Sequence, residues 1–87
     1  MEDERFACRV CGLHCADPPW GADGQCPTFD ICDCCGVQFG YEDSLPASAR
    51  RYRDAWLRNS CEWFRAKSKP EDWSWERQQA RVPRQFG

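Results

Sequence analysis

The sequence is poor in the groups that most enzymes use for chemistry, because it contains a single histidine, His14. It carries no Ser-His-Asp set for acyl transfer and no glycine-rich loop for holding phosphate. Glu42 and Asp43 are adjacent carboxylates, but no neighbouring group suggests an acid–base task for them. We therefore expect no enzymatic activity.

Long hydrophobic runs are also missing. No apolar stretch approaches the roughly 18 residues that a membrane-spanning helix needs, so we expect no membrane association. The N-terminal residues 1–6 lack the basic start and the apolar stretch of a secretory signal. These two absences favour a cytoplasmic protein, in which thiols stay reduced.

What the sequence has in abundance is cysteine, with eight in 87 residues. A chain of this length is expected to form a single domain over residues 1–87. Domains this small bury a modest fraction of their surface and are commonly stabilised by disulfides or a metal. In a reducing compartment, paired cysteines favour a metal, and a disulfide framework is the alternative.

Two short segments, 8–12 and 32–36, share the pattern Cys-x-x-Cys-Gly. Two cysteines three apart on a tight turn can direct both sulfurs at one ion, and the following glycine permits the positive φ that closes the turn. The 20 residues between the two pairs match the spacing of a zinc ribbon. The pattern predicts one structural Zn²⁺ in a closed tetrahedral site, with four ligands: Cys8, Cys11, Cys32 and Cys35.

Iron is the alternative metal, since rubredoxin-like electron carriers also use two such pairs. Their pairs lie further apart in sequence, and they have no counterpart to the basic, tryptophan-rich second half of this chain. Cys34 adjoins Cys35, and neighbouring side chains point apart, so both cannot easily serve one ion. Three other cysteines have no paired spacing and could form a second metal site with His14: Cys15, Cys26 and Cys61. The alternative is that these four cysteines are buried or incidental thiols that pack as small hydrophobic groups.

The expected fold class is a small metal-stabilised α+β protein. Residues 6–43 are predicted to form a zinc-ribbon-like double knuckle with short antiparallel strands, since apolar and polar residues alternate over 28–31 and 37–41. Residues 44–82 are predicted to form a segment of two C-terminal helices.

Capping and helix-breaking residues set the expected helix bounds. Ser44 and Pro46 occupy cap and first-turn positions of the first helix, and Asn59 is its predicted end. The second helix is expected to begin near Pro70, where acidic residues follow, and to end before Pro83. The last four residues are expected to be loose.

Charge differs sharply between the two halves. Residues 1–45 have nine acidic and two basic side chains, whereas residues 46–87 have five acidic and ten basic ones.

A non-catalytic module that binds a protein partner is the function we expect. A nucleic-acid-binding zinc ribbon is a less favoured alternative, because the isoelectric point is about 5.3. The predicted partner-binding residues combine aromatic and charged side chains: Trp20, Glu42, Asp43, Arg50, Trp73 and Trp75.

Four stretches of this sequence together resemble a known family: residues 8–12, 18–21, 29–36 and 39–43. The family is that of the bacterial cysteine-rich CPCC-type proteins, which are short chains with a double knuckle. Arg9 and Asp33 depart from the pattern, because proline is common at those two positions in the family. Some proteins of this build are encoded beside secreted toxins. The resemblance therefore implies, as an alternative function, an immunity protein that neutralises a bacterial toxin.

Overall fold

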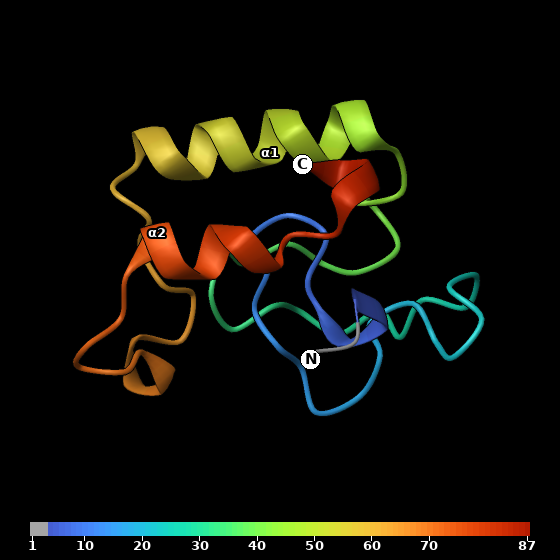
Figure 1. Ribbon diagram of the computed structural model, residues 1–87, viewed down its shortest axis with the longest axis horizontal. Helices are drawn as coiled ribbons and strands as arrows, with labels where there is room; N and C mark the ends of the chain where they lie inside the picture. The colour runs from blue at the N-terminus through green and yellow to red at the C-terminus, as the bar shows by residue number, and fades with distance from the viewer. Residues whose placement is uncertain (1–3) are drawn as a thin grey trace.

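The computed structural model describes residues 4–87. Helix α1 (Pro46–Arg58) runs along one side of the molecule, and the short helix α2 (Trp75–Gln78) lies on the same side of α1 as the irregular N-terminal half (Figure 1). Four short 3-10 helices complete the regular structure: η1 (Glu4–Phe6), η2 (Ala66–Ser68), η3 (Gln79–Arg81) and η4 (Arg84–Phe86). Within these residues, neither α-helix is both long and apolar enough to cross a bilayer.

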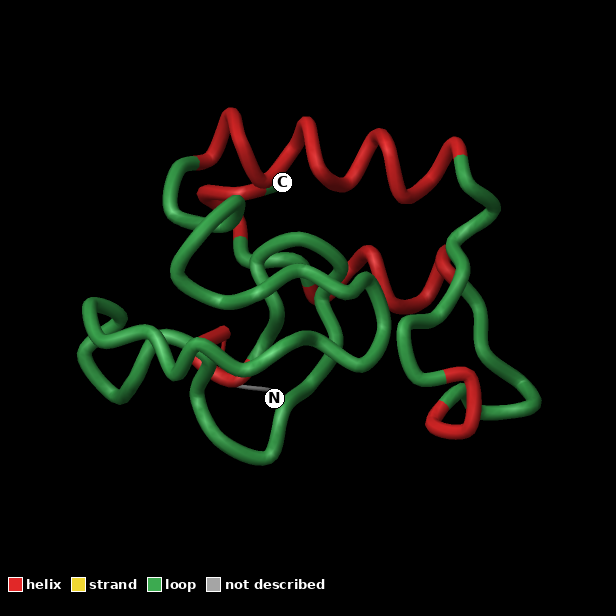
Figure 2. Tube along the Cα trace, turned by 180° about the vertical axis from the view of Figure 1, so that it is seen from behind, coloured by secondary structure: helices red, strands yellow, loops and turns green. Residues whose placement is uncertain are grey.

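The expected α+β fold class, with short antiparallel strands and two C-terminal helices, is wrong. Over residues 4–87 the structure has no β-strand, and Figure 2 shows only helices and loops. Antiparallel pairing is limited to two isolated bridges, Ala7 with His14 and Ile31 with Gln38. The N-terminal half is therefore a pair of irregular knuckles, and only α1 is longer than one helical turn.

Backbone conformation explains why pairing at the second knuckle stops after one bridge. Phe29 has a φ of 65° and Gly40 a φ of 105°, so both chain segments leave the extended region two residues beyond the bridge. A strand requires negative φ at successive residues. The alternation of apolar and polar residues over 28–31 and 37–41 is present, but the backbone that carries it is not extended throughout.

The first helix lies close to where the sequence predicted it. It begins at Pro46, and Asn59 caps its C-terminal end. The N-cap is Leu45 in an extended conformation, not Ser44. The Ser44 hydroxyl instead donates to the carbonyl of Gly40 at 3.0 Å and so fixes the preceding turn.

The second helix is shorter than predicted and begins later. Helix α2 is a single turn that starts at Trp75, after Ser74 at the N-cap position, and continues as η3. The predicted start near Pro70 is a turn, closed by a hydrogen bond from the Trp73 amide to the Pro70 carbonyl at 3.2 Å. This turn directs the chain so that the Trp73 indole can pack on α1.

Tryptophan rings fill the space between the helices. Trp56 of α1 is buried and meets the rings of Trp73 and Trp75 edge to face, at centroid distances of 6.2 and 5.2 Å. Trp63, also buried, meets Trp73 in the same manner at 5.8 Å. Aromatic rings bury a large area per residue, which suits a short chain with few other large core residues.

The C-terminal residues are held in place, contrary to the expected loose end. Phe86 is 6% exposed. The guanidinium of Arg9 lies between its ring and that of Trp20, at 4.5 and 4.1 Å from the two ring centres. Arg53 of α1 donates to the Phe86 carbonyl and also to the carbonyls of Arg9 and Val10. Two arginines thus join the chain end to the first knuckle by cation–π contacts and hydrogen bonds.

Gly12 is predicted to be irreplaceable by alanine, because its φ is 82° and an added Cβ would lie 2.6 Å from the Gln78 carbonyl oxygen. Gly24 is the matched control, since its φ is 74° but an added Cβ would meet nothing within 4 Å. Gly24→Ala should cost about 1 kcal/mol from backbone strain alone, and Gly12→Ala clearly more. Urea unfolding measures both, and equal midpoints would contradict the close packing of the knuckle on the C-terminal segment.

Candidate metal centre

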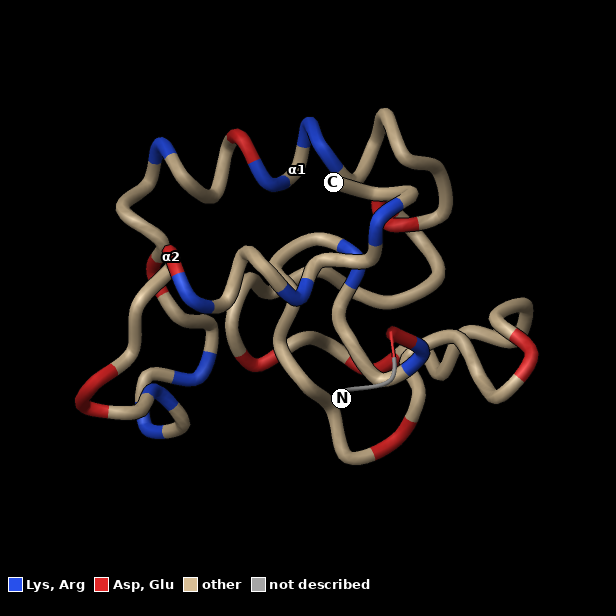
Figure 3. The backbone as a smooth tube through the Cα atoms, in the orientation of Figure 1, with Lys and Arg blue, Asp and Glu red and all other residues tan. Residues whose placement is uncertain are grey.

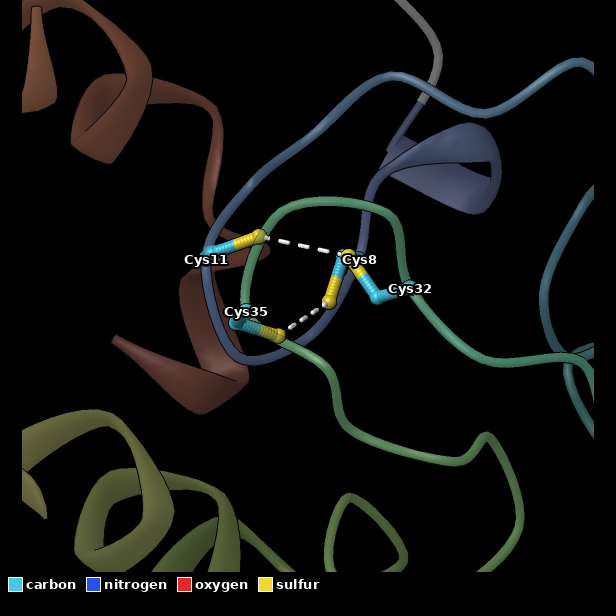
Figure 4. Close-up of side chains that lie close together, drawn as sticks. All are labelled: Cys8, Cys11, Cys32 and Cys35. Atoms are coloured by element: carbon cyan, nitrogen blue, oxygen red, sulfur yellow. Dashed lines mark hydrogen bonds between the residues drawn. The ribbon is translucent and has the colours of Figure 1, made fainter. Parts of the chain in front are cut away.

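The two knuckles bring their paired cysteines to one point. The Sγ atoms lie within 4.8 Å of one another, and all four side chains are buried (Figure 4): Cys8, Cys11, Cys32 and Cys35. The Sγ atoms of Cys8 and Cys35 are 3.7 Å apart, and those of Cys11 and Cys32 are 3.6 Å apart. A tetrahedral ion with metal–sulfur bonds of about 2.3 Å would place its sulfurs about 3.8 Å apart. The four cysteines could therefore hold one metal ion.

The same local structure forms each knuckle. The Gly12 amide donates to the Cys8 carbonyl at 2.9 Å, and the Gly36 amide donates to the Cys32 carbonyl at 3.0 Å. Both glycines have positive φ, 82° and 81° respectively. Because only glycine adopts this conformation without a Cβ penalty, the glycine after each cysteine pair closes the turn that aims both sulfurs inward.

The electrostatics of the sulfur cluster favour a cation at its centre. Burial raises the pKa of Cys11 and of Cys35 well above the usual value. Hydrogen bonds from neighbouring thiols, chiefly that of Cys11, lower the pKa of Cys32 instead. Without an ion the cluster thus cannot ionise fully, since adjacent buried thiolates repel one another. A divalent cation would compensate these charges and displace the protons.

The remaining cysteines do not form a second centre. Residues 4–87 contain no other group of three or more close metal-ligating side chains, and His14 stacks on Phe6 with a centroid distance of 5.6 Å. Cys34 is buried, Cys15 and Cys61 are half-buried, and Cys26 is exposed. All eight thiols of the chain are free in the structure, without disulfides.

Gln78 supports the centre and was not anticipated from the sequence. It is 7% exposed, and its Nε2 donates to the Cys11 carbonyl at 3.0 Å and to the Cys34 sulfur at 3.3 Å. Its Oε1 accepts from the Trp73 indole at 2.7 Å. Gln78 therefore ties α2 to both knuckles. The only sequence clue is a polar residue three positions after Trp75, and such residues are usually exposed.

The predicted acidic loop is divided between surface and interior. Glu42 is exposed, but Asp43 is 0% exposed. The Asp43 carboxylate accepts from the Trp20 indole at 2.7 Å and from the Gly40 amide at 2.8 Å. Asp43 and Trp20 thus hold the loop together, and the Asp43 side chain is not available to a partner.

The other predicted partner residues also differ in exposure. Arg50 is exposed on α1, and basic residues recur along this helix, as the blue segments of the tube in Figure 3 show. Trp73 and Trp75 are half-buried and both pack on Trp56. Their main contacts are with the core, so they do not form one open aromatic surface with Arg50.

Thiol reactivity should follow this difference in burial. Burial raises the pKa of Cys15 to about 12, so roughly one thiol in ten thousand is ionised at pH 8. We expect iodoacetamide to modify the exposed Cys26 well before Cys15 in the folded, metal-loaded protein, as followed by peptide mass spectrometry. In denaturant the two should react at similar rates. Equal rates in the folded protein would contradict the placement of Cys15.

These features define a cysteine-rich protein with one buried four-sulfur centre. The chain is similar to the uncharacterized protein YoaQ of Bacillus subtilis (strain 168), with 27% identity over 83% of this chain and 74% of that protein. It is also similar to the uncharacterized protein YozI of the same organism, with 26% identity over 77% of this chain and 69% of that protein. No family model and no solved structure matches the chain. The resemblance to CPCC-type proteins stays a prediction.

Proposed function

We propose that the protein is a non-catalytic zinc-binding module of the cytoplasm that binds another protein. The observation that carries the zinc assignment is the burial of its four sulfur ligands, whose exposed fractions are between 0 and 6%. Four thiolates complete the coordination of Zn²⁺ and leave no open position for water or substrate. The ion would hold the two knuckles together, and eight free thiols fit a reducing compartment.

Apolar side chains on the surface support a role in protein binding. Large apolar groups that are contiguous and exposed mark interaction sites in small soluble domains. In this chain, four such side chains in or beside the second knuckle are 43 to 60% exposed: Phe29, Ile31, Tyr41 and Phe64.

Binding to nucleic acid has less support, because part of the positive charge is used inside the fold. Arg53 donates three hydrogen bonds to main-chain carbonyls. Arg9 is held between two rings and donates to the carbonyls of Gly24 and Asp43. Neither guanidinium is positioned to contact a phosphate backbone, which is the main source of affinity for nucleic acids.

Metal analysis combined with affinity capture tests this proposal. Protein purified without added metal should contain one zinc per chain, and a tagged zinc-loaded form should retain a discrete protein from native lysate even after nuclease treatment. Iron with visible absorbance would favour the electron-carrier alternative. Capture that nuclease abolishes would favour nucleic acid, and capture of a secreted toxin would favour an immunity protein.

A further inference from the structure

Two hollows meet at the exposed ring of Phe64. One, of about 680 Å³, is lined by aromatic rings from α1 and the segment after it together with polar residues such as Glu62, and we call it the tryptophan hollow. Its aromatic residues are Tyr52, Trp56, Trp63 and Phe64. The other, of about 610 Å³, combines apolar and acidic side chains, and we call it the acidic hollow: Asp17, Phe29, Asp30, Ile31, Asp33 and Phe64. Phe64 lines both, so the two hollows form one continuous surface.

Phe64 is 54% exposed, but its backbone is held in place by the second knuckle. Its amide donates to the Cys34 carbonyl at 3.0 Å, and the Arg65 amide donates to the Asp33 carbonyl at 2.8 Å. The Arg65 side chain adds an ion pair with the Asp33 carboxylate at 2.8 Å. The segment is thus fixed along the second knuckle. A ring presented in this way loses little conformational freedom on binding, which favours it as an anchor.

Phe29, in the acidic hollow, provides a second and independent observation. It is 54% exposed and has a φ of 65°, in the left-handed region. A bulky residue with positive φ is rare, and the strain costs on the order of 1–3 kcal/mol. Glycine or asparagine would adopt this conformation with less strain. The phenyl ring is not part of the buried core: it lies over Gly40, and its aromatic contact is with Tyr41, itself 60% exposed.

The charge around these rings is negative. Among the described residues that line the acidic hollow, Arg65 is the one arginine or lysine, and it is paired with Asp33. Asp17 and Asp30 also line this hollow, and Glu62 lines the tryptophan hollow. Each hollow is also lined by one ligand of the proposed zinc centre: Cys35 lines the tryptophan hollow and Cys32 lines the acidic hollow. With four thiolates and one Zn²⁺, that centre would carry a net charge of minus two. A ligand of complementary charge is therefore basic.

We propose that the two hollows and Phe64 form the docking surface for a basic segment of a partner protein that carries an apolar anchor residue. The anchor would enter the tryptophan hollow beside Phe64, and arginine or lysine side chains would face Asp17 and Asp30. This assignment rests on the proposed protein-binding function and names the surface and the chemistry of the partner.

Selection of a random linear peptide library on the zinc-loaded full chain tests the assignment. The enriched peptides should combine arginine or lysine with an aromatic or aliphatic residue. The affinity of a synthetic peptide made from the enriched sequence should fall at least about tenfold with Phe64→Ala, and less strongly with Asp30→Asn. Titration calorimetry measures the affinity, and circular dichroism with zinc content verifies that each variant is folded.

Two variants outside both hollows serve as matched controls. Leu45→Ala removes an exposed apolar side chain, 63% exposed, and Glu71→Gln removes an exposed negative charge. Both should leave the affinity for the peptide unchanged. Loss of affinity in these controls equal to that in Phe64→Ala would overturn the assignment.

Other outcomes also overturn the assignment. Acidic enriched peptides, no enrichment, or binding that Phe64→Ala leaves unchanged would remove this surface as the docking site. Self-association in sedimentation equilibrium that Phe64→Ala abolishes would assign the surface to a second copy of the chain. Peptides that bind elsewhere would leave the protein-binding function standing, whereas the absence of both a binding peptide and a captured protein would remove both proposals.

Discussion

Removal of the metal is expected to unfold residues 6–43. Structural zinc contributes roughly 10–16 kcal/mol in small peptides at neutral pH, which matches or exceeds the total stability of a typical domain, about 5–15 kcal/mol. Here the dependence should be strong because each knuckle is closed by one isolated bridge of its own, Ala7 with His14 or Ile31 with Gln38, and over residues 4–87 no sheet joins the two knuckles. The four sulfurs themselves belong to the buried core, so loss of the ion leaves thiols crowded at its centre.

Chelation under reducing conditions, followed by far-UV and near-UV circular dichroism, measures this effect. Both spectra should lose their signals, because Arg53 and Gln78 tie the helical segment, with α1 and four of the five tryptophans, to the first knuckle, so the helices lose this support when the knuckles unfold. Both signals should recover when zinc is returned. Cys11→Ser should reproduce the loss, since it removes one sulfur of the centre. Cys26→Ser is the matched control, because Cys26 is exposed and lies outside the cluster. Spectra that chelation leaves unchanged would contradict a metal-dependent fold.

The convergence of the four cysteines was predictable because a knuckle is a local structure. Each turn is specified by two cysteines and a glycine within five residues, 8–12 and 32–36, and its hydrogen bonds are formed within or next to that segment. The bounds of α1 were predictable for a similar reason, since Pro46 and Asn59 act on the helix ends directly.

The strands could not be excluded from the sequence, because the alternating pattern does not determine backbone conformation. Phe29 is a residue type common in strands, yet it adopts a φ of 65°. The length of α2 depends on tertiary contacts as well. Gln78 is positioned by hydrogen bonds to Cys11 and Cys34, which are distant in sequence. A local sequence pattern does not predict such contacts.

The surface residues were the least predictable part of the candidate site. Asp43 has the sequence features of an exposed acidic loop, and its burial depends on the Trp20 indole, which approaches from 23 positions away. Conversely, Phe64 follows the buried Trp63 directly and is itself 54% exposed. Neighbouring residues on an extended chain point in opposite directions, and only the packing of the whole segment determines which one faces inward.

Trp56→Ala is expected to cost about 3–5 kcal/mol of unfolding free energy, as truncation of a buried aromatic residue generally does. Trp56 is 6% exposed and contacts the rings of Trp73 and Trp75. Its indole N–H also donates to the Glu62 carbonyl at 3.0 Å. The substitution would leave a cavity between α1 and α2 and an unpaired carbonyl. Urea unfolding monitored by far-UV circular dichroism gives the change.

Phe64→Ala is the matched control, since it truncates an aromatic residue nearby that is 54% exposed. It should cost less than about 1 kcal/mol. Equal losses in the two variants would contradict the central position of Trp56 in the core.

The Trp56 variant also tests whether the knuckles and the helical segment unfold as one unit. Gln78 of α2 is bonded to the Cys11 carbonyl and to the Trp73 indole. Loosening of the tryptophan cluster should therefore reach the metal centre through α2. Zinc release to a chromophoric chelator should be faster in Trp56→Ala than in the unsubstituted protein or in Phe64→Ala. If the helices of Trp56→Ala have unfolded and its rate of zinc release is nevertheless unchanged, residues 6–43 and 44–82 fold independently. In that case the metal site persists without the tryptophan cluster that packs against it.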